Sequence, residues 1–256
     1  MGKYKYGLKL WSNNNNYINE AKKLHQRKVY DYIELYIVPG SYDKYVKIWH
    51  KLDIPFIIHC THSAHRFNLA QANRCKRNLE IFSEVRAFCD ELKGKYIIFH
   101  PGIKGKVEEC IKQINLLRDK RLLVENKPYI SMSKEPCRGS LYQEINKILD
   151  SCDIGFCLDI SHAFNTAYHI KVDEYQYTEG MLSLSPKVIH ISDGRISPIH
   201  DKHLNIGQGD FDFSKIKKII SLSKAELLTL ETCKNSDGLA TFIEDIKKVK
   251  NILNNE

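Results

Sequence analysis

Nine side chains that could bind metal ions lie at or just beyond the ends of short apolar segments in this 256-residue chain. Imidazole and carboxylate groups, with no thiolate among them, are typical ligands of zinc, manganese and related divalent ions. Because one ion needs only three or four ligands, nine candidates predict a cluster of two or three ions, an arrangement that binds and attacks phosphodiesters. The nine residues are His59, His100, Glu125, Asp159, His162, His190, Asp201, His203 and Glu231.

Each of these residues, taken alone, has a simpler interpretation. A single histidine at a strand end is more often a loop residue or a hydrogen-bonded core residue than a ligand, and a buried glutamate can pair with a lysine or arginine. Their shared position at one end of successive segments favours a common site, because the C-terminal ends of parallel barrel strands meet at one rim. Near the third segment, the choice between His59 and His62 as ligand stays open.

The segments that must position these groups alternate between strand-like and helix-like patterns. Near-continuous apolar strands predict burial on both faces, as in parallel sheets. Eight such segments span residues 6–11, 32–37, 55–60, 95–100, 121–126, 154–159, 188–192 and 226–231. Helical periodicity marks residues 15–26, 42–52, 68–92, 106–117, 140–149, 213–222 and 239–253, and is clearest in 68–92, where Leu69, Ala72, Leu79, Phe82 and Val85 share a stripe. The alternation predicts an α/β protein, a single (β/α)8 TIM barrel over residues 1–256 with its metal site at the C-terminal rim.

Composition narrows the class of protein. The length suits one barrel of roughly 250 residues, and no apolar run approaches the ~20 residues of a membrane span. With no signal-peptide pattern and eight cysteines that form no C-x-x-C pair, we expect a cytoplasmic, monomeric protein with reduced, buried thiols and no membrane contact. The net charge of +8 suits a polyanion such as nucleic acid, but lysines on solvated helix faces explain it equally well.

Six motifs occur in an order that resembles a known family. They are FHPG (99–102), VEN (124–126), CLDISHAF (157–164), HISD (190–193), DKHLNIGQG (201–209) and LET (230–232). On these motifs the chain, from about residue 55 to its end, resembles the endonuclease IV family (AP endonuclease family 2) of the xylose-isomerase-like TIM barrels. The segments LKLWSNNNN (8–16) and IELYIVPG (33–40) depart from the family pattern at the first two strand ends, which help the family bind damaged DNA. Lys127-Pro128-Tyr129 stands where the family usually has a Gly-rich segment.

The resemblance implies a three-zinc centre, in which manganese could replace zinc. The first ion would be held by His59, His100 and Glu125. Glu125 would bridge to the second, completed by Asp159, His190 and Glu231. His162, Asp201 and His203 would hold the third. The implied activity is hydrolysis of damaged duplex DNA on the 5′ side of an abasic site, with Glu125, Asp159 and Glu231 as catalytic carboxylates.

Two other functions remain to be separated from this one. A sugar isomerase or epimerase of the same superfamily would need a single divalent ion, held by Glu125, Asp159, His190 and Glu231. The discriminating residues are therefore His59, His100, Asp201 and His203, which a one-metal enzyme has no need to place at the rim. A non-catalytic nucleic-acid-binding barrel is disfavoured, because buried carboxylates without a cation are costly.

Overall fold

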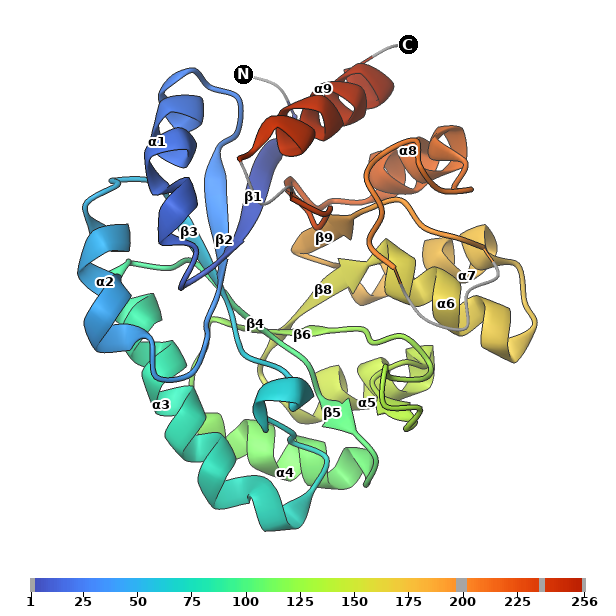
Figure 1. Cartoon of the computed structure of the whole chain (residues 1–256). Coiled ribbons are helices and arrows are strands. Elements are labelled where there is room, and N and C mark those ends of the chain that lie inside the picture. The colour runs from blue at the N-terminus through green and yellow to red at the C-terminus, as the bar shows by residue number, and fades with distance from the viewer. Residues whose placement is uncertain (1–2, 197–201, 235–237, 255–256) are drawn as a thin grey trace.

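Eight parallel strands close into a barrel with helices around it (Figure 1). The computed structural model describes residues 3–196, 202–234 and 238–254. The hydrogen-bonded order around the barrel is β1-β10-β9-β8-β6-β4-β3-β2, so the first and last strands are neighbours. The strands are β1 (Lys5–Trp11), β2 (Tyr32–Tyr36), β3 (Phe56–His59), β4 (Ile97–Phe99), β6 (Leu122–Glu125), β8 (Gly155–Asp159), β9 (Val188–Ile191) and β10 (Leu227–Leu230). Each coincides with one of the eight apolar segments, which confirms the predicted TIM barrel.

Inside the barrel, a polar layer lies on an apolar layer. Alternate strand residues face the same side, so residues two apart share the interior. The apolar layer consists of Tyr32, Ile57, Ile98, Leu123, Cys157, Val188 and Leu227. Two positions further along each segment come Glu34, His59, His100, Glu125, Asp159, His190 and Thr229, all buried. The strand period therefore gathers the polar groups into one layer toward the C-terminal end of the barrel.

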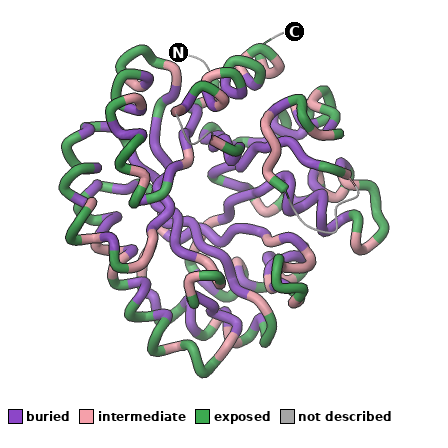
Figure 2. Tube along the Cα trace, in the orientation of Figure 1, coloured by how far each residue is buried: buried purple, intermediate pink, exposed green. Residues whose placement is uncertain are grey.

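The other faces of the strands pack against the helices in a larger apolar core. Figure 2 shows buried strands throughout and helices that alternate between buried and exposed residues. No helix among the described residues is long and apolar enough to cross a membrane. The helices are α1 (Ile18–Gln26), α2 (Tyr42–His50), α3 (Cys75–Glu91), α4 (Val107–Leu117), α5 (Tyr142–Ser151), α6 (Ile160–Ile170), α7 (Glu174–Gly180), α8 (Phe213–Leu222) and α9 (Ala240–Asn254). Short 3-10 helices span Asn15–Tyr17, Ser63–His65, Ala72–Arg74 and Met181–Leu184.

The start of the third helix was predicted wrongly. Helix α3 begins at Cys75 rather than at residue 68, and Ala72 and Leu79 are exposed instead of lying on its buried stripe. The preceding loop is fixed by buried amides: Asn78 Oδ1 accepts a hydrogen bond from the Asn68 backbone N–H at 2.9 Å, and its Nδ2 donates to the Asn68 carbonyl at 2.8 Å. Amide side chains that bond to nearby backbone groups compete with helix formation.

Two helices between β8 and β9 were not predicted. Helix α6 starts directly after the strand, where the Asp159 side chain accepts a hydrogen bond from the His162 N–H at 2.7 Å and caps the helix. The first eight residues of α6 are all buried, so the helix lacks the amphipathic pattern by which surface helices are predicted. Helix α7 has only seven residues, too few for a clear periodic pattern. A two-stranded antiparallel sheet of β5 (Gly102–Ile103) and β7 (Cys137–Arg138) lies beside the barrel.

The eight cysteines are all free thiols, as expected, but they are not all buried. Cys75 is partly exposed and Cys233, close to the C-terminal rim, is exposed. Burial raises the pKa of the Cys157 thiol inside the barrel to about 12, so this side chain stays protonated at neutral pH.

Candidate metal centre

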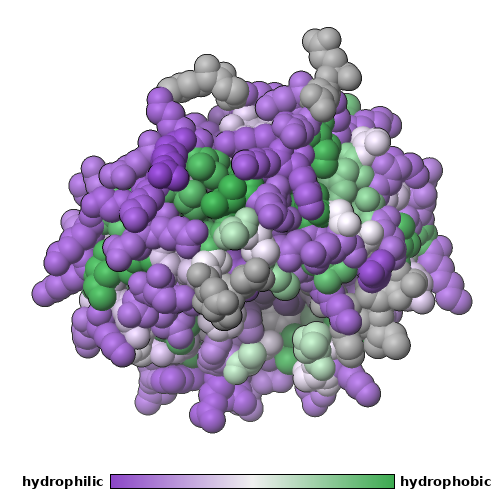
Figure 3. All heavy atoms as spheres, turned by 45° about the horizontal axis from the view of Figure 1, so that its top comes forward, coloured by the Kyte–Doolittle hydropathy of each residue, from purple (hydrophilic) through white to green (hydrophobic). Residues whose placement is uncertain are grey.

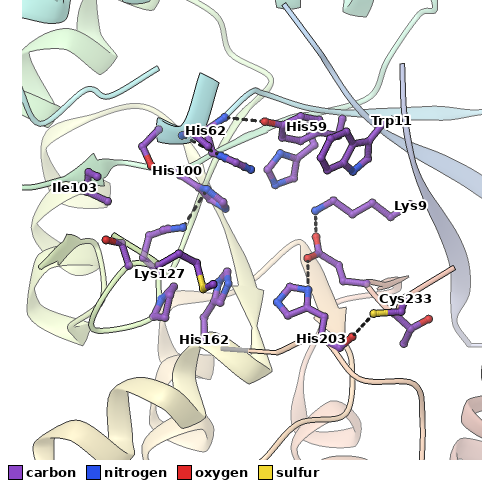
Figure 4. Close-up of a pocket in the computed structure, with 18 of the residues that line it drawn as sticks. Lys9, Trp11, His59, His62, His100, Ile103, Lys127, His162, His203 and Cys233 are labelled. Atoms are coloured by element: carbon purple, nitrogen blue, oxygen red, sulfur yellow. Dashed lines mark hydrogen bonds and ion pairs between the residues drawn. The ribbon is translucent and has the colours of Figure 1, made fainter. Parts of the chain in front are cut away.

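A cavity of about 800 Å³ opens at the C-terminal end of the barrel. The face of the molecule drawn in Figure 3 is mainly hydrophilic, with smaller hydrophobic areas between the polar side chains. In the cavity, imidazoles from several strand ends and the ammonium group of Lys9 point toward a common space (Figure 4). Residues of its wall include Lys9, Trp11, Tyr36, His59, His62, His100, Lys127, His162, His203, Glu231 and Lys234.

The first predicted ligand set comes together at the ends of β3, β4 and β6. His59 Nε2 lies 2.9 Å and His100 Nε2 lies 3.1 Å from Glu125 Oε2. The other nitrogen of His59, Nδ1, lies 2.8 Å from the carbonyl of Cys60 and donates to it, which leaves Nε2 as the lone-pair nitrogen that faces Glu125. His59, not His62, therefore belongs to this group, and His62 lies in the cavity wall.

The second predicted set shares Glu125 with the first. His190 Nδ1 lies 3.0 Å from Glu231 Oε1, 3.5 Å from Glu125 Oε1 and 3.7 Å from Asp159 Oδ2. One ligand atom from each of these four residues lies within 4.8 Å of the others, a spacing that a single ion could bridge. All four side chains are at most 9% exposed.

Two residues of the third predicted set also converge. His162 and His203 form a group with Asp159, again within 4.8 Å, while Asp201 lies outside the described residues. Figure 4 shows His203 and Lys9 directed at one carboxylate, that of Glu231, whose Oε2 lies 3.0 Å from His203 Nδ1. The Asp159 backbone is held by Asn126, whose side chain accepts from its N–H at 2.8 Å and donates to its carbonyl at 2.9 Å.

Asp193 anchors the loop that carries His203. Its carboxylate accepts hydrogen bonds from the N–H groups of Gly194 (2.8 Å), Gly207 (2.8 Å), Gly209 (2.9 Å) and Phe211 (3.3 Å). Gly207 has a φ of +85°, and a Cβ on Gly209 would collide with the Gly194 carbonyl and the Asp193 carboxylate. The HISD and IGQG motifs are thus two parts of one loop anchor.

We expect Asp193→Ala to lower the free energy of unfolding by about 3 kcal/mol, because four backbone amides lose their acceptor. Urea denaturation measures the change. Asp210→Ala is the control in the same loop. Among the described residues its half-exposed carboxylate forms an ion pair with the half-exposed Arg195, and its loss should change the free energy of unfolding by less than about 0.5 kcal/mol. Equal effects of the two substitutions would contradict the anchor role.

The electrostatic state of Glu125, His59 and His100 favours cation binding. Burial raises the pKa of Glu125, but the imidazoles of His100 and His190 outweigh it and hold the pKa of this carboxyl well below its usual range. Burial lowers the pKa of His59 and of His100, so both rings are neutral at pH 7 and keep a lone pair. Ionised carboxylates beside neutral imidazoles are the forms that ligate metal ions.

Several buried atoms of the site lack the partners that protein groups normally find. Within the described part of the chain, Glu125 Oε1, His100 Nε2 and His190 Nδ1 make no hydrogen bond. Each of these atoms faces other ligand atoms of the same groups. A divalent cation between them would satisfy these lone pairs, so the residues present fit a bound metal.

The sequence prediction missed two charged residues of the site, Lys9 on β1 and Glu34 on β2. The Lys9 ammonium lies 3.1 Å from Glu34 Oε1 and also pairs with Glu231. Glu34 is fully buried in the polar layer inside the barrel. The available signal was a single charged residue in each of two otherwise apolar strands, LKLW and IELY, since an unpaired charge is rarely placed in a buried strand.

Comparison with known proteins identifies the family. The family model described as xylose isomerase-like TIM barrel matches residues 22–252. The chain belongs to the xylose isomerase-like TIM-barrel family. Within this family, the probable endonuclease 4 of Mycoplasmopsis pulmonis is 26% identical over 198 residues, which cover 70% of each protein. The resemblance seen in the motifs is thereby confirmed.

Solved structures with the same fold include both an epimerase-like protein and an endonuclease. A D-tagatose 3-epimerase-like protein superimposes with a TM-score of 0.77 at 16% identity and covers 97% of both chains. Endonuclease IV from Thermus thermophilus superimposes with a TM-score of 0.74 at 17% identity, covering 97% of this chain and 98% of that one. At these identities the likeness concerns the fold alone.

Proposed function

We propose that this protein is a zinc-dependent AP endonuclease that hydrolyses the phosphodiester on the 5′ side of abasic sites in duplex DNA. The observation that carries the proposal is the convergence of three ligand groups in one cavity, joined through Glu125 and Asp159. The curated relatives named probable endonuclease 4 support the same activity. The proposal includes a single-domain monomer that acts in the cytoplasm.

The residues divide into ion-binding and substrate-facing groups. His59, His100 and Glu125 would hold one ion, Asp159, His190 and Glu231 with Glu125 a second, and His162 and His203 a third, to which we assign Asp201 as well. When bound, such ions lower the pKa of a coordinated water toward about 7 and offset charge on phosphoryl oxygens. Two further lysines of the cavity wall, Lys127 and Lys234, add positive charge where a DNA backbone would enter.

A second candidate is a one-metal sugar isomerase or epimerase. One observation favours it: the first two strands carry Lys9 and Glu34 in the region where the chain departs from the endonuclease pattern. Against it, the His59–His100 and His162–His203 pairs lie beyond the four ligands that one ion needs. We therefore place the nuclease first.

The test uses a 5′-labelled duplex with one abasic-site analogue. We expect the zinc-loaded protein to make a single incision on the 5′ side of the lesion, and a chelator to abolish it because the ions supply the nucleophile. The undamaged duplex is the control and should stay intact. Intact lesion duplex, together with epimerisation of a ketohexose by the manganese-loaded protein, would replace the nuclease by the second candidate.

A further inference from the structure

Glu34 lies beneath the three ligand groups described above and belongs to none of them, although one of its oxygens also lies within 4.8 Å of ligand atoms of His59 and Glu231. It is fully buried on β2, and its Oε2 accepts two hydrogen bonds, from His190 Nε2 at 2.9 Å and from Thr229 Oγ1 at 2.7 Å. Its other oxygen, Oε1, lies 3.1 Å from the Lys9 ammonium. Both oxygens of this carboxylate therefore have a polar partner, Oε2 through hydrogen bonds and Oε1 through an ion pair.

These contacts determine which nitrogen of His190 carries a proton. A carboxylate accepts hydrogen bonds only, and Nε2 faces Glu34 alone, whereas Nδ1 faces the three carboxylates that would share an ion with it. With a cation held by those carboxylates, the proton of a neutral His190 therefore lies on Nε2. The opposite nitrogen, Nδ1, then presents its lone pair toward Glu231, Glu125 and Asp159, at 3.0 to 3.7 Å. A carboxylate behind a histidine is a common means of fixing the ring orientation and raising the basicity of a metal ligand.

The position of Glu34 is itself held from two further strands. The Thr229 hydroxyl on β10 donates to Glu34, and the Tyr32 hydroxyl lies 2.9 Å from that of Thr229. Lys9 on β1 connects Glu34 to Glu231, since its ammonium contacts both carboxylates. The positive charge of Lys9 lies next to Oε1 of Glu34 and offsets the negative charge of this carboxylate, which can therefore stay ionised without contact with solvent.

We propose that Glu34 is a positioning residue for the metal centre: it fixes the Nε2–H tautomer of His190 and aims Nδ1 at the ion shared with Glu125, Asp159 and Glu231. The inference rests on the metal-binding part of the proposed function and does not depend on the substrate. It assigns a role to the strand where the chain departs from the endonuclease pattern.

Zinc affinity of variants tests the inference without an activity assay. In competition with a fluorescent zinc chelator, Glu34→Ala should weaken one ion by about 10- to 100-fold and leave the other ions unchanged. Glu34→Gln, which keeps the volume and a neutral acceptor, should show a smaller loss. Tyr30→Phe is the matched control, because it removes a buried hydroxyl that donates to the Ala21 carbonyl outside the Glu34 network, and its zinc affinity should stay within about twofold of the wild type.

The ring tautomer gives a second readout that needs no variant. Long-range proton–nitrogen spectra of the zinc-loaded wild-type protein should show His190 with Nε2 protonated and Nδ1 unprotonated. A ring protonated at Nδ1, wild-type zinc affinity in Glu34→Ala, or an equal loss of zinc in Tyr30→Phe would each overturn the inference. A wild-type protein that takes up no zinc would instead overturn the metal centre, and this inference with it.

Discussion

Replacement of Glu125 by glutamine is expected to abolish cleavage of abasic-site DNA while the barrel stays folded. Glu125 is the one residue shared by the first two ligand groups, with one oxygen near His59 and His100 and the other near His190. A neutral amide of the same shape loses the charge that holds both ions. Because metal ions stabilise a phosphoryl transition state by several kcal/mol, and each 1.36 kcal/mol is a factor of ten, the rate should fall by at least about 10³-fold.

Single-turnover cleavage assays at saturating zinc measure this loss. Glu84→Gln serves as the control, since that carboxylate lies outside the cavity and accepts hydrogen bonds from the N–H groups of residues 40–42. It should reduce stability and leave the cleavage rate within a few fold. Glu125→Gln protein that is folded by circular dichroism and still cleaves within tenfold of the wild-type rate would contradict the bridging role.

Addition of zinc to the metal-free protein should raise its melting temperature by roughly 10 °C. The ligands are preformed in the folded chain and dispersed in the unfolded one, so the ions bind the native state preferentially. A ligand at 1,000 times its Kd stabilises by about 4 kcal/mol, and each kcal/mol shifts the melting temperature of a domain of this size by about 2 to 4 °C. A chelator should reverse the shift.

Differential scanning fluorimetry across a zinc series, paired with elemental analysis, checks this result. We expect about three zinc ions per chain, one for each ligand set implied by the family resemblance. Magnesium at equal concentration is the control ion, because imidazole-rich sites bind it weakly. A content near one ion would favour the isomerase, and no thermal shift would contradict a metal centre.

The barrel strands were predictable because burial on both faces leaves a nearly continuous apolar segment. The polar layer could be predicted for the same reason, because a polar residue at a strand end interrupts an otherwise apolar segment. Helix α6 was missed for a related reason: its buried first eight residues give it no polar face to set the period of a surface helix. The contact between Asn78 and Asn68 was not predicted, because nothing in the local sequence marks a side-chain amide that bonds to the backbone of a residue ten positions away.

The site was predicted less completely than the fold. Glu125 and His190 could be proposed as ligands from sequence because they lie within or near the ends of apolar segments that belong to ordered motifs. Lys9 and Glu34 lie inside strands of the region that departs from the family, where position along the chain does not reveal which charges meet. Their pairing depends on the closed barrel, which brings β1, β2 and β10 side by side.

The closure of the barrel has a consequence for biosynthesis. Strand β1 pairs with β10, with Lys5 opposite Leu227 and Leu8 opposite Leu230, so the sheet cannot close until residue 230 has left the ribosome. Until then, a nascent chain exposes two unpaired sheet edges, which are prone to association with other chains. Glu231 follows directly after β10, so the seam and the ligand cluster are completed by the same few codons, and a prematurely terminated product would have neither.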